Sequence, residues 1–137
     1  MRARGPVAAL RVAYAFAAIA RDLPGAPGLV AASLRREDLS TFWTLTLWRS
    51  IGAMAGFRNQ NPHRSWMGSV EPLCDESAWR RLAWESPGLP DWAEAQRLLL
   101  AEPRFTAMDG VSPDQAACRI VARRLGRVRT VEPIRSD

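Results

Sequence analysis

Two neighbouring segments of the chain, residues 29–36 and 41–48, have the pattern of a β-hairpin. In the second segment, aromatic and β-branched side chains alternate in the way that suits a pleated sheet. One face of that strand would carry Phe42, Thr44, Thr46 and Trp48, and the other Trp43, Leu45 and Leu47. Only a short polar turn around residues 36–38 separates the two segments. The sequence therefore predicts an antiparallel pair of strands at the centre of the fold.

Helices are predicted on both sides of this hairpin. Residues 7–21 are almost wholly apolar and follow Pro6, which suits the first turn of a helix, so this helix should be covered on more than one side. A second helix should begin after Ser50, a good N-cap residue. It should break at residues 59–62 and restart at Pro62.

The second half of the chain carries weaker signals. Apolar residues favour a strand over residues 76–85. Asp91 and Glu94 have the spacing of a capping box at the start of a helix. The later elements expected are a helix at 92–101, a helix from Ser112 to Leu125 and an extended segment at 127–134.

With a short first strand at residues 1–5, the predicted order is strand, helix, strand, strand, helix, strand. This order indicates an α+β fold of the ferredoxin-like kind, in which an antiparallel sheet has its helices on one face. Residues 1–102 would form this domain, and residues 103–137 a helical C-terminal extension packed on it. A chain of 137 residues leaves little room for a second domain.

The face of the sheet away from the helices is expected to need a cover of its own. It would carry Phe42, Trp48 and Trp84, which together are too apolar to face water. A second copy of the chain is the usual cover for such a face. We therefore expect a homodimer in which the two sheets close into a dimeric α+β barrel.

All nineteen basic residues are arginine, and the net charge is +5. This pattern has two interpretations. A coding bias toward arginine and alanine codons explains it without any function, whereas arginine forks also match phosphate oxygens. The arginines are scattered along the chain until the final stretch from Arg119 onward. Such scatter indicates a solvated surface and argues against nucleic-acid binding.

Two features bear on where the protein resides. Cys74 and Cys118 have no metal-ligand spacing and are too few for a disulfide scaffold, so they are expected as free thiols in the cytoplasm. The apolar run at residues 7–20 follows basic residues, as in a secretory signal, but Arg11 interrupts it and it is too short to span a bilayer. We interpret this run as a buried helix, with a secretory signal as the alternative.

Several motifs carry a resemblance to a known family. They are Thr44–Ser50, then Ala53, Met54 and Phe57, then Asn61–Met67, and a Leu-Pro-x-Trp stretch at residues 89–92. This pattern resembles the dimeric α+β barrel superfamily, in particular its antibiotic-biosynthesis-monooxygenase type and spheroidene-monooxygenase-like proteins. The likeness covers roughly residues 1–102. It specifies fold better than function, because the superfamily includes monooxygenases, haem-degrading enzymes, dye peroxidases and proteins of no known activity.

The resemblance implies a monooxygenase-like protein, cofactorless or haem-dependent, that binds a small aromatic or polyene molecule in the barrel. The alternative is a non-catalytic ligand-binding or interaction protein on the same fold. In the haem-degrading branch, a tryptophan and an iron-ligating histidine would fall here on Phe57 and Met67, and neither matches. Haem degradation of that type is therefore not expected, and a haem ligated by His63 in another register stays open.

The candidate catalytic residues are His63, Asn61 and Arg64. His63 is the only histidine, and no other type of side chain has an unperturbed pKa in the physiological range. The alternative role is structural, in which His63 stabilises the helix break at residues 59–61. The candidate substrate-binding residues, whose alternative place is the core and the dimer interface, are Trp43, Trp48, Phe57, Trp66 and Trp84. No metal is expected, because the sequence contains no cluster of metal ligands.

Overall fold

The computed structural model describes residues 1–121 and 127–131 and shows an α+β fold. Its central element is an antiparallel sheet of three strands in the order β3, β2, β7. These strands are β2 (Leu29–Arg36), β3 (Phe42–Trp48) and β7 (Arg127–Val131). The predicted hairpin is confirmed, since β2 pairs with β3 along nearly all of its length.

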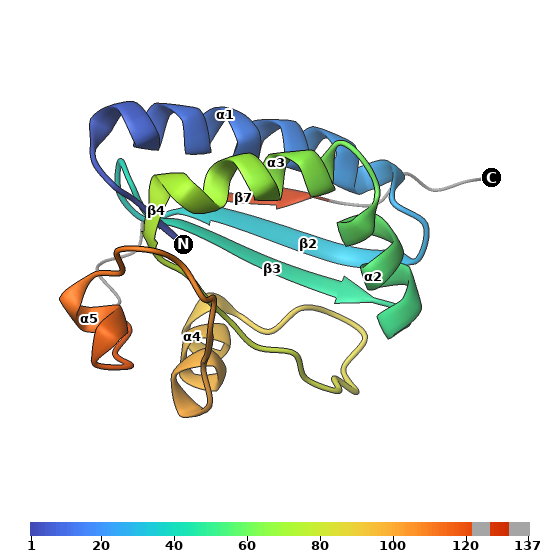
Figure 1. Ribbon diagram of the computed structural model, residues 1–137. Helices are drawn as coiled ribbons and strands as arrows, with labels where there is room; N and C mark the ends of the chain where they lie inside the picture. The colour runs from blue at the N-terminus through green and yellow to red at the C-terminus, as the bar shows by residue number, and fades with distance from the viewer. Residues whose placement is uncertain (122–126, 132–137) are drawn as a thin grey trace.

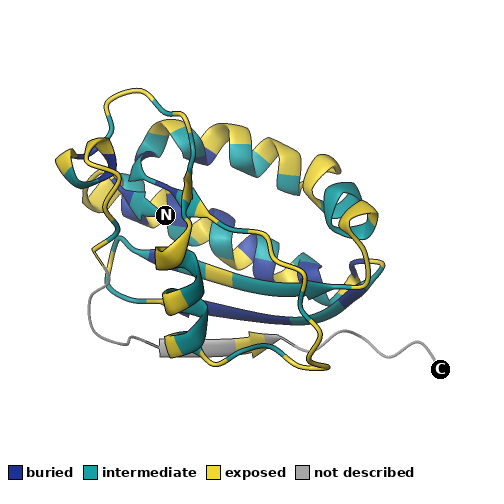
Figure 2. Ribbon diagram, turned by 90° about the horizontal axis from the view of Figure 1, so that it is seen from below, coloured by how far each residue is buried: buried dark blue, intermediate teal, exposed yellow. Residues whose placement is uncertain are grey.

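Helices lie on both sides of this sheet (Figure 1). One face is covered by α1 (Pro6–Asp22) and α3 (His63–Val70). On the opposite side lie α4 (Trp92–Ala101) and α5 (Pro113–Ala116). Figure 2, seen from that side, shows α4 lying across part of the second face of the sheet, with exposed residues along its outer surface. The two faces therefore have different covers.

A separate two-stranded sheet lies beside the first. β1 (Arg2–Ala3) pairs with β4 (Cys74–Glu76) in antiparallel fashion. An isolated antiparallel bridge joins Arg2 to Thr41, the residue before β3. This one bridge places the two sheets side by side in the order β4, β1, β3, β2, β7.

The strand predicted at residues 76–85 is wrong in its extent. Beyond β4, only the two-residue β5 (Ala78–Trp79) is a strand, and its partner is β6 (Arg104–Phe105). The reason lies at Ser77, whose backbone N–H donates to the side-chain oxygen of Gln115 at 2.6 Å and not to a neighbouring strand. This side-chain contact separates β4 from β5.

The prediction of a helix at residues 7–21 is confirmed by α1, which packs on the sheet through small side chains. Its buried residues are Ala9, Val12, Ala15, Ala18 and Ala20. Such side chains let a helix approach a sheet closely, and Phe16 contacts Phe42 of β3 with ring centroids 5.2 Å apart. The helix ends in a 3-10 turn, Leu23–Gly25, whose leucine is also buried.

The sequence predicts that this helix is covered on more than one side, but the outer face of α1 is exposed in the single chain. Val7, Leu10 and Tyr14 follow each other at helical spacing and are between 68% and 75% exposed in the single chain.

In the described part of the chain, no helix is long and apolar enough to cross a membrane.

The two faces of β3 are reversed relative to the sequence-based expectation. Phe42 lies beneath α1, and Trp48 packs against Phe57 of α2 (Ile51–Asn59), with ring centroids 5.4 Å apart. Trp84 belongs to no strand, and its indole N–H donates to a carbonyl of its own loop. The alternation of the strand therefore places on the other face Trp43, Leu45 and Leu47. Because both faces of β3 are apolar, alternation alone could not decide which one the helices cover.

Ser50 caps α2 as predicted, since its side chain accepts the Ala53 N–H at 3.1 Å. The first turn of α2 lies directly against the loop before β2. Gly28 there has a φ of +80°, and a Cβ at this position would lie 2.6 Å from the Cβ of Ala53. Only glycine fits this close approach. After α2 the helix restarts as α3, which continues into a 3-10 turn at Glu71–Leu73.

The helix predicted from Ser112 to Leu125 is wrong in its length. Ser112 does cap a helix, because its hydroxyl accepts the Gln115 N–H at 3.1 Å. However, α5 ends at Ala116, and the described residues from there to Val121 are not helical. Gln115 is buried and its side chain binds the β4–β5 segment, which fixes the direction of the chain here. Residues 122–125 and, from the predicted terminal segment, residues 132–134 lie outside the described part.

The cap of α4 gives a test of the local structure. The Asp91 side chain accepts the Glu94 N–H at 2.8 Å, so Asp91→Ala should lower the free energy of unfolding by about 1 kcal/mol. Asp91→Asn keeps a side-chain oxygen at the cap and should stay within about 0.5 kcal/mol of the parent. Urea unfolding of the three proteins measures both effects. An unchanged midpoint for Asp91→Ala would show that the cap contributes nothing.

Candidate functional site

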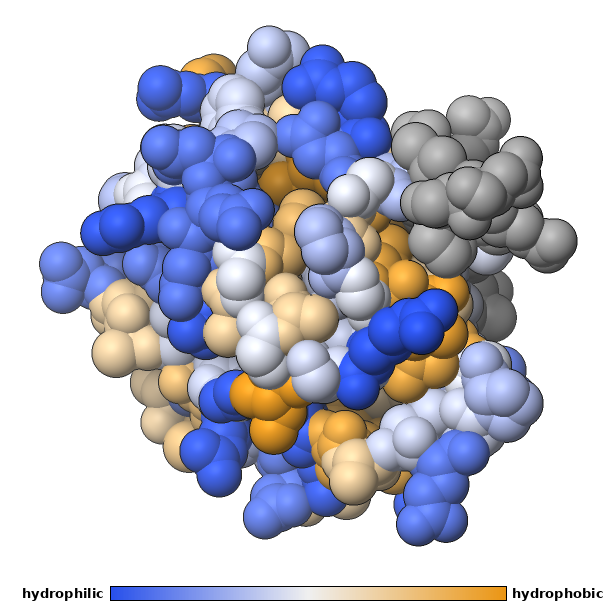
Figure 3. All heavy atoms as spheres, turned by 90° about the vertical axis from the view of Figure 1, so that its right-hand side faces the viewer, coloured by the Kyte–Doolittle hydropathy of each residue, from blue (hydrophilic) through white to orange (hydrophobic). Residues whose placement is uncertain are grey.

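A pocket of about 160 Å³ lies between the end of α1, the loop that follows it and the junction of α2 with α3. Its apolar wall consists of Ile19, Ala26, Pro27, Phe57 and Pro62. Its polar groups come from Asp22, Gln60, Asn61 and His63. Figure 3 shows the end of the molecule where these elements meet, with hydrophobic surface interrupted by hydrophilic side chains. We call this space the His63 pocket.

The helix break between α2 and α3 places His63 in this pocket. Gln60 leaves the helix with an extended backbone, and α3 then begins at His63. The Ser65 hydroxyl donates to the Asn61 side-chain oxygen at 2.6 Å, which fixes Asn61 at the turn. The imidazole packs against Phe57, with ring centroids 5.0 Å apart. The break therefore has a defined shape.

The protonation of His63 follows from its surroundings. Its Nδ1 lies 3.2 Å from the Arg58 carbonyl oxygen, and because a carbonyl can only accept, Nδ1 carries the proton in this contact. Burial lowers the pKa of His63 below its ordinary value of 6.5; the bond to the Arg58 carbonyl opposes this shift, and the Arg58 charge adds to it. The neutral ring is thus favoured at pH 7, with a lone pair on Nε2. In this state His63 can accept a hydrogen bond or a proton.

Three of the predicted site residues line the His63 pocket: His63, Asn61 and Phe57. Trp48 lies behind Phe57 and supports its ring. Arg64, the third candidate catalytic residue, is exposed, and its side chain does not line the pocket. The contact of His63 with Arg58 spans the helix break, so the structural and the chemical interpretations of this histidine are compatible.

The remaining candidate aromatic residues lie elsewhere. Trp66 of α3 contacts Tyr14 of α1 edge to face, with ring centroids 5.4 Å apart. Trp84 lies in the loop before α4. Trp43 lies on the opposite side of the sheet, where its indole N–H donates to Glu37 at 2.7 Å. The predicted aromatic residues therefore do not converge on one cavity.

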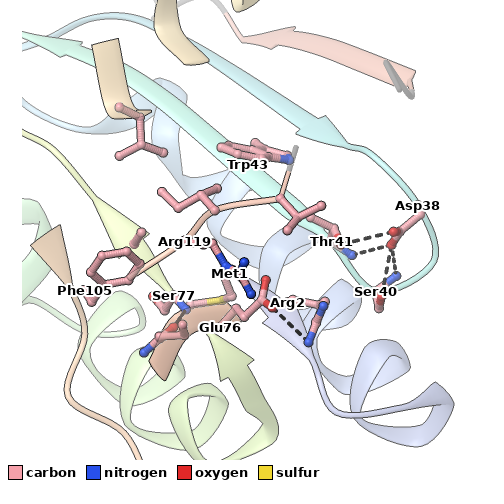
Figure 4. A pocket seen from close by; sticks show the side chains of 15 residues that line it. Met1, Arg2, Asp38, Ser40, Thr41, Trp43, Glu76, Ser77, Phe105 and Arg119 are labelled. Carbon is pink, nitrogen blue, oxygen red and sulfur yellow. Dashed lines mark hydrogen bonds and ion pairs between the residues drawn. The ribbon is translucent and has the colours of Figure 1, made fainter. Parts of the chain in front are cut away.

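A smaller cavity of about 70 Å³ lies beside Trp43, near β1 and the start of β3 (Figure 4). Its charged side chains already have partners within the protein. Arg2 forms ion pairs with Asp75 at 3.1 Å and Glu76 at 2.9 Å. Asp38 accepts hydrogen bonds from Ser40 and Thr41, shown as dashed lines. We interpret this network as support for the β1–β3 contact.

Sequence reasoning missed part of the wall of the His63 pocket. Asp22, Ile19 and Pro27 come from the end of α1 and its loop, about forty residues before His63. The helix ending at the proline- and glycine-rich loop was visible in the sequence, but nothing in it indicated that this loop meets the α2–α3 junction.

In the ranges 1–121 and 127–131, no group of three or more histidine, cysteine, aspartate or glutamate residues is placed to hold a metal ion. Comparison with known proteins supplies no further functional residue. No family model, no curated protein and no solved structure matches the chain.

The environment of His63 predicts a pH dependence. Its folded pKa lies below the unfolded value, so between the two values the unfolded chain binds more protons. The contribution of His63 to stability is therefore complete above about pH 6.5 and decreases as the pH falls below it. Since His63 is the only histidine, an NMR titration of its ring protons gives the folded pKa directly.

The matched variant is His63→Asn. The decrease of the urea midpoint between about pH 7.5 and about pH 5.5 should be smaller in this variant than in the parent, because the titrating ring is gone. A folded pKa at or above 6.5 in the NMR titration would contradict the described burial of the ring.

Proposed function

We propose that this protein binds a small aromatic molecule with a hydroxyl group in the His63 pocket. The observation that carries this proposal is the convergence of His63, Asn61 and Phe57 on one space of about 160 Å³. An apolar wall with a few oriented polar groups is typical of ligand pockets. Here the wall is supplied mainly by α1 and its loop, and the polar groups mainly by the α2–α3 junction.

The size of the pocket limits the ligand to about one ring. A cavity of roughly 150 Å³ in another protein accommodates benzene, and the His63 pocket has a similar volume of about 160 Å³. A polyene is too long for this space. A haem is also too large to lie within it, because its macrocycle contains four rings.

The polar groups of the pocket select the kind of ring. Nε2 of neutral His63 can accept a hydrogen bond from a ligand hydroxyl, while the Asn61 and Gln60 amides supply further partners. Asp22 adds a carboxylate to the wall, which disfavours an anionic ligand. A phenol-like molecule, neutral and carrying one donor, fits these groups best.

Monooxygenase-like turnover is the catalytic form of this proposal. His63 would take the proton of the bound hydroxyl as the ring gives its electrons to dioxygen, so that no free phenolate forms beside Asp22. A ring C–H bond is replaced by C=O, one oxygen atom of dioxygen enters the quinone product, and the other leaves as water. Ligand binding without turnover is the alternative, and it needs only the pocket and its hydrogen bonds. Oxygen consumption in the presence of a bound phenol distinguishes the two forms.

Binding of phenol and 4-methylphenol tests the pocket. Both should shift the ring-proton signals of His63, and His63→Ala should weaken binding by up to about tenfold, because one hydrogen bond is lost. Binding can be followed in that variant by the change in tryptophan fluorescence, to which Trp48 contributes because it packs on Phe57. Arg64→Ala is the matched control, since Arg64 is exposed at the next position and does not line the pocket. Unshifted His63 signals with both probes would refute the proposal.

We further propose that the sheet is ferredoxin-like and that two chains pair through its second face to form a dimeric α+β barrel. The strand order β4, β1, β3, β2, with α1 and α3 on one face, supports this fold. The half-buried Trp43, Leu45 and Leu47 on the other face offer apolar surface for a second copy.

A cytoplasmic location is supported by the two cysteines. Both are free. Burial raises the pKa of the Cys74 thiol to about 11, which keeps it in the unreactive thiol form. Free thiols, one of them exposed, suit a reducing compartment.

The homodimer can be tested by light scattering after size exclusion, where the parent should have about twice the mass of one chain. Leu45→Glu places a charge on the proposed interface and should give a monomer. Leu10→Glu is the control, because Leu10 is 74% exposed on the outer face of α1, and it should leave the dimer intact. A monomeric parent, or a dimer lost only in the Leu10 variant, would refute the barrel.

A further inference from the structure

Arg35 of β2 is a buried cation without a hydrogen-bond partner in the part of the chain that the structure describes. It is 1% exposed, and among the described residues none of its three guanidinium nitrogens has an acceptor. Buried charges are almost always paired, because an uncompensated one costs several kcal/mol. Arg35 follows Leu34, which belongs to the core beneath α1, so alternation directs Arg35 to the second face of the sheet. This face lies opposite the His63 pocket.

The surroundings of Arg35 are rich in donors. The guanidinium lies over the ring of Trp92, 5.7 Å from its centroid. The Trp92 indole N–H donates to the Ser33 hydroxyl oxygen at 3.2 Å, so the hydroxyl hydrogen remains free to donate. Gln96 lies one turn further along the same face of α4, and its amide nitrogen is buried without a partner among the described residues. A cation–π contact compensates a buried charge only in part.

The neighbouring carboxylates do not neutralise Arg35. Glu37 follows on the same strand face, but one of its oxygens accepts from Trp43 at 2.7 Å and the other has no partner in the described residues. No ion pair between Glu37 and Arg35 is present in the described structure. On α4, Glu94 is paired with Arg97 at 2.6 Å. The acceptor that Arg35 requires is therefore missing from this part of the chain.

We propose that the buried guanidinium of Arg35, between β2 and the Trp92 end of α4, is a binding site for an oxyanion, a phosphate or carboxylate group carried by a small ligand. Arg35 supplies the charged fork that matches two oxygens of such a group, and Ser33 and Gln96 supply neutral donors. Access is possible because α4 has no fully buried residue, so displacing its first turn exposes little of the core. The site is independent of the His63 pocket.

The test is the thermal unfolding of the full chain in inorganic phosphate, and in parallel in benzoate, at constant ionic strength set with sodium chloride. Binding to the folded state should raise Tm with a saturating dependence on the anion. Phosphate also stabilises proteins by exclusion from their surface, but that effect does not saturate and is shared by all variants. If phosphate saturates at the lower concentration, the bound group is a phosphate. If benzoate saturates at the lower concentration, the bound group is a carboxylate.

Arg35→Met removes the cation and should abolish the saturating shift, while Tm in sodium chloride stays equal or rises because a buried charge is gone. Arg35→Lys keeps the charge but loses the fork, and should bind at least about tenfold more weakly. Arg35→Lys also keeps the proposal testable if Arg35→Met fails to fold. Arg49→Met, at an exposed arginine of the same hairpin, is the control and should keep the full shift.

Two results would overturn the proposal. One is a parent protein whose Tm shows no saturating response to either anion. The other is a response that persists unchanged in Arg35→Met. Glu37→Gln supplies a further check, since it should leave anion binding equal or tighter by removing a nearby negative charge. If that variant gains a response that the parent lacks, Glu37 is the partner of Arg35 and the site is not an anion site.

Discussion

The contact of α1 with β2 and β3 is the interaction on which the rest of this structure depends. The helix contributes mainly alanines, and the strands contribute Ala32, Leu34 and Phe42 to the buried layer. Side chains this small leave no room for a change of register or for a larger residue, because overpacking a core typically costs about 1–3 kcal/mol. The position of α1 then fixes its C-terminal end, and with it the wall that closes the His63 pocket against the α2–α3 junction.

This contact also gives the two faces of β2 different roles. Ala32 and Leu34 are buried under the helix, whereas Ser33 and Arg35, at the alternate positions, are buried on the other side. A strand that is buried on both faces is expected to be apolar throughout. The polar pair departs from that rule on the face that α4 covers only in part. Departures of this kind are where a functional site is to be expected in an otherwise consistent sequence.

The sequence predicted most of what is determined locally. The caps at Ser50 and Asp91 and the hairpin of β2 and β3 depend on neighbours within a few residues, and all are confirmed. The errors concern choices made by distant contacts. The side chain of Gln115 interrupts the strand predicted at residues 76–85, and no local pattern indicates that contact. In the candidate site, His63 could be predicted because it is the only histidine in the sequence. The opposite wall of its pocket could not be predicted, because it comes from the end of α1.

The proposed oxyanion site and the proposed homodimer constrain each other. A second copy stacked on the face that carries Trp43 and Leu45 would bring its own Arg35 toward the same interface by two-fold symmetry. Two buried guanidinium groups without acceptors would repel each other and would each lose their hydration. A barrel closed in this way is therefore stable only if each Arg35 receives an acceptor, either from a bound anion or from a carboxylate such as Glu37, whose second oxygen lacks a partner in the described residues. If the chain is monomeric, the acceptor for Arg35 has to come from a ligand bound between β2 and α4. In both cases the charge on β2, which has no partner among the described residues, determines what this face of the sheet can bind.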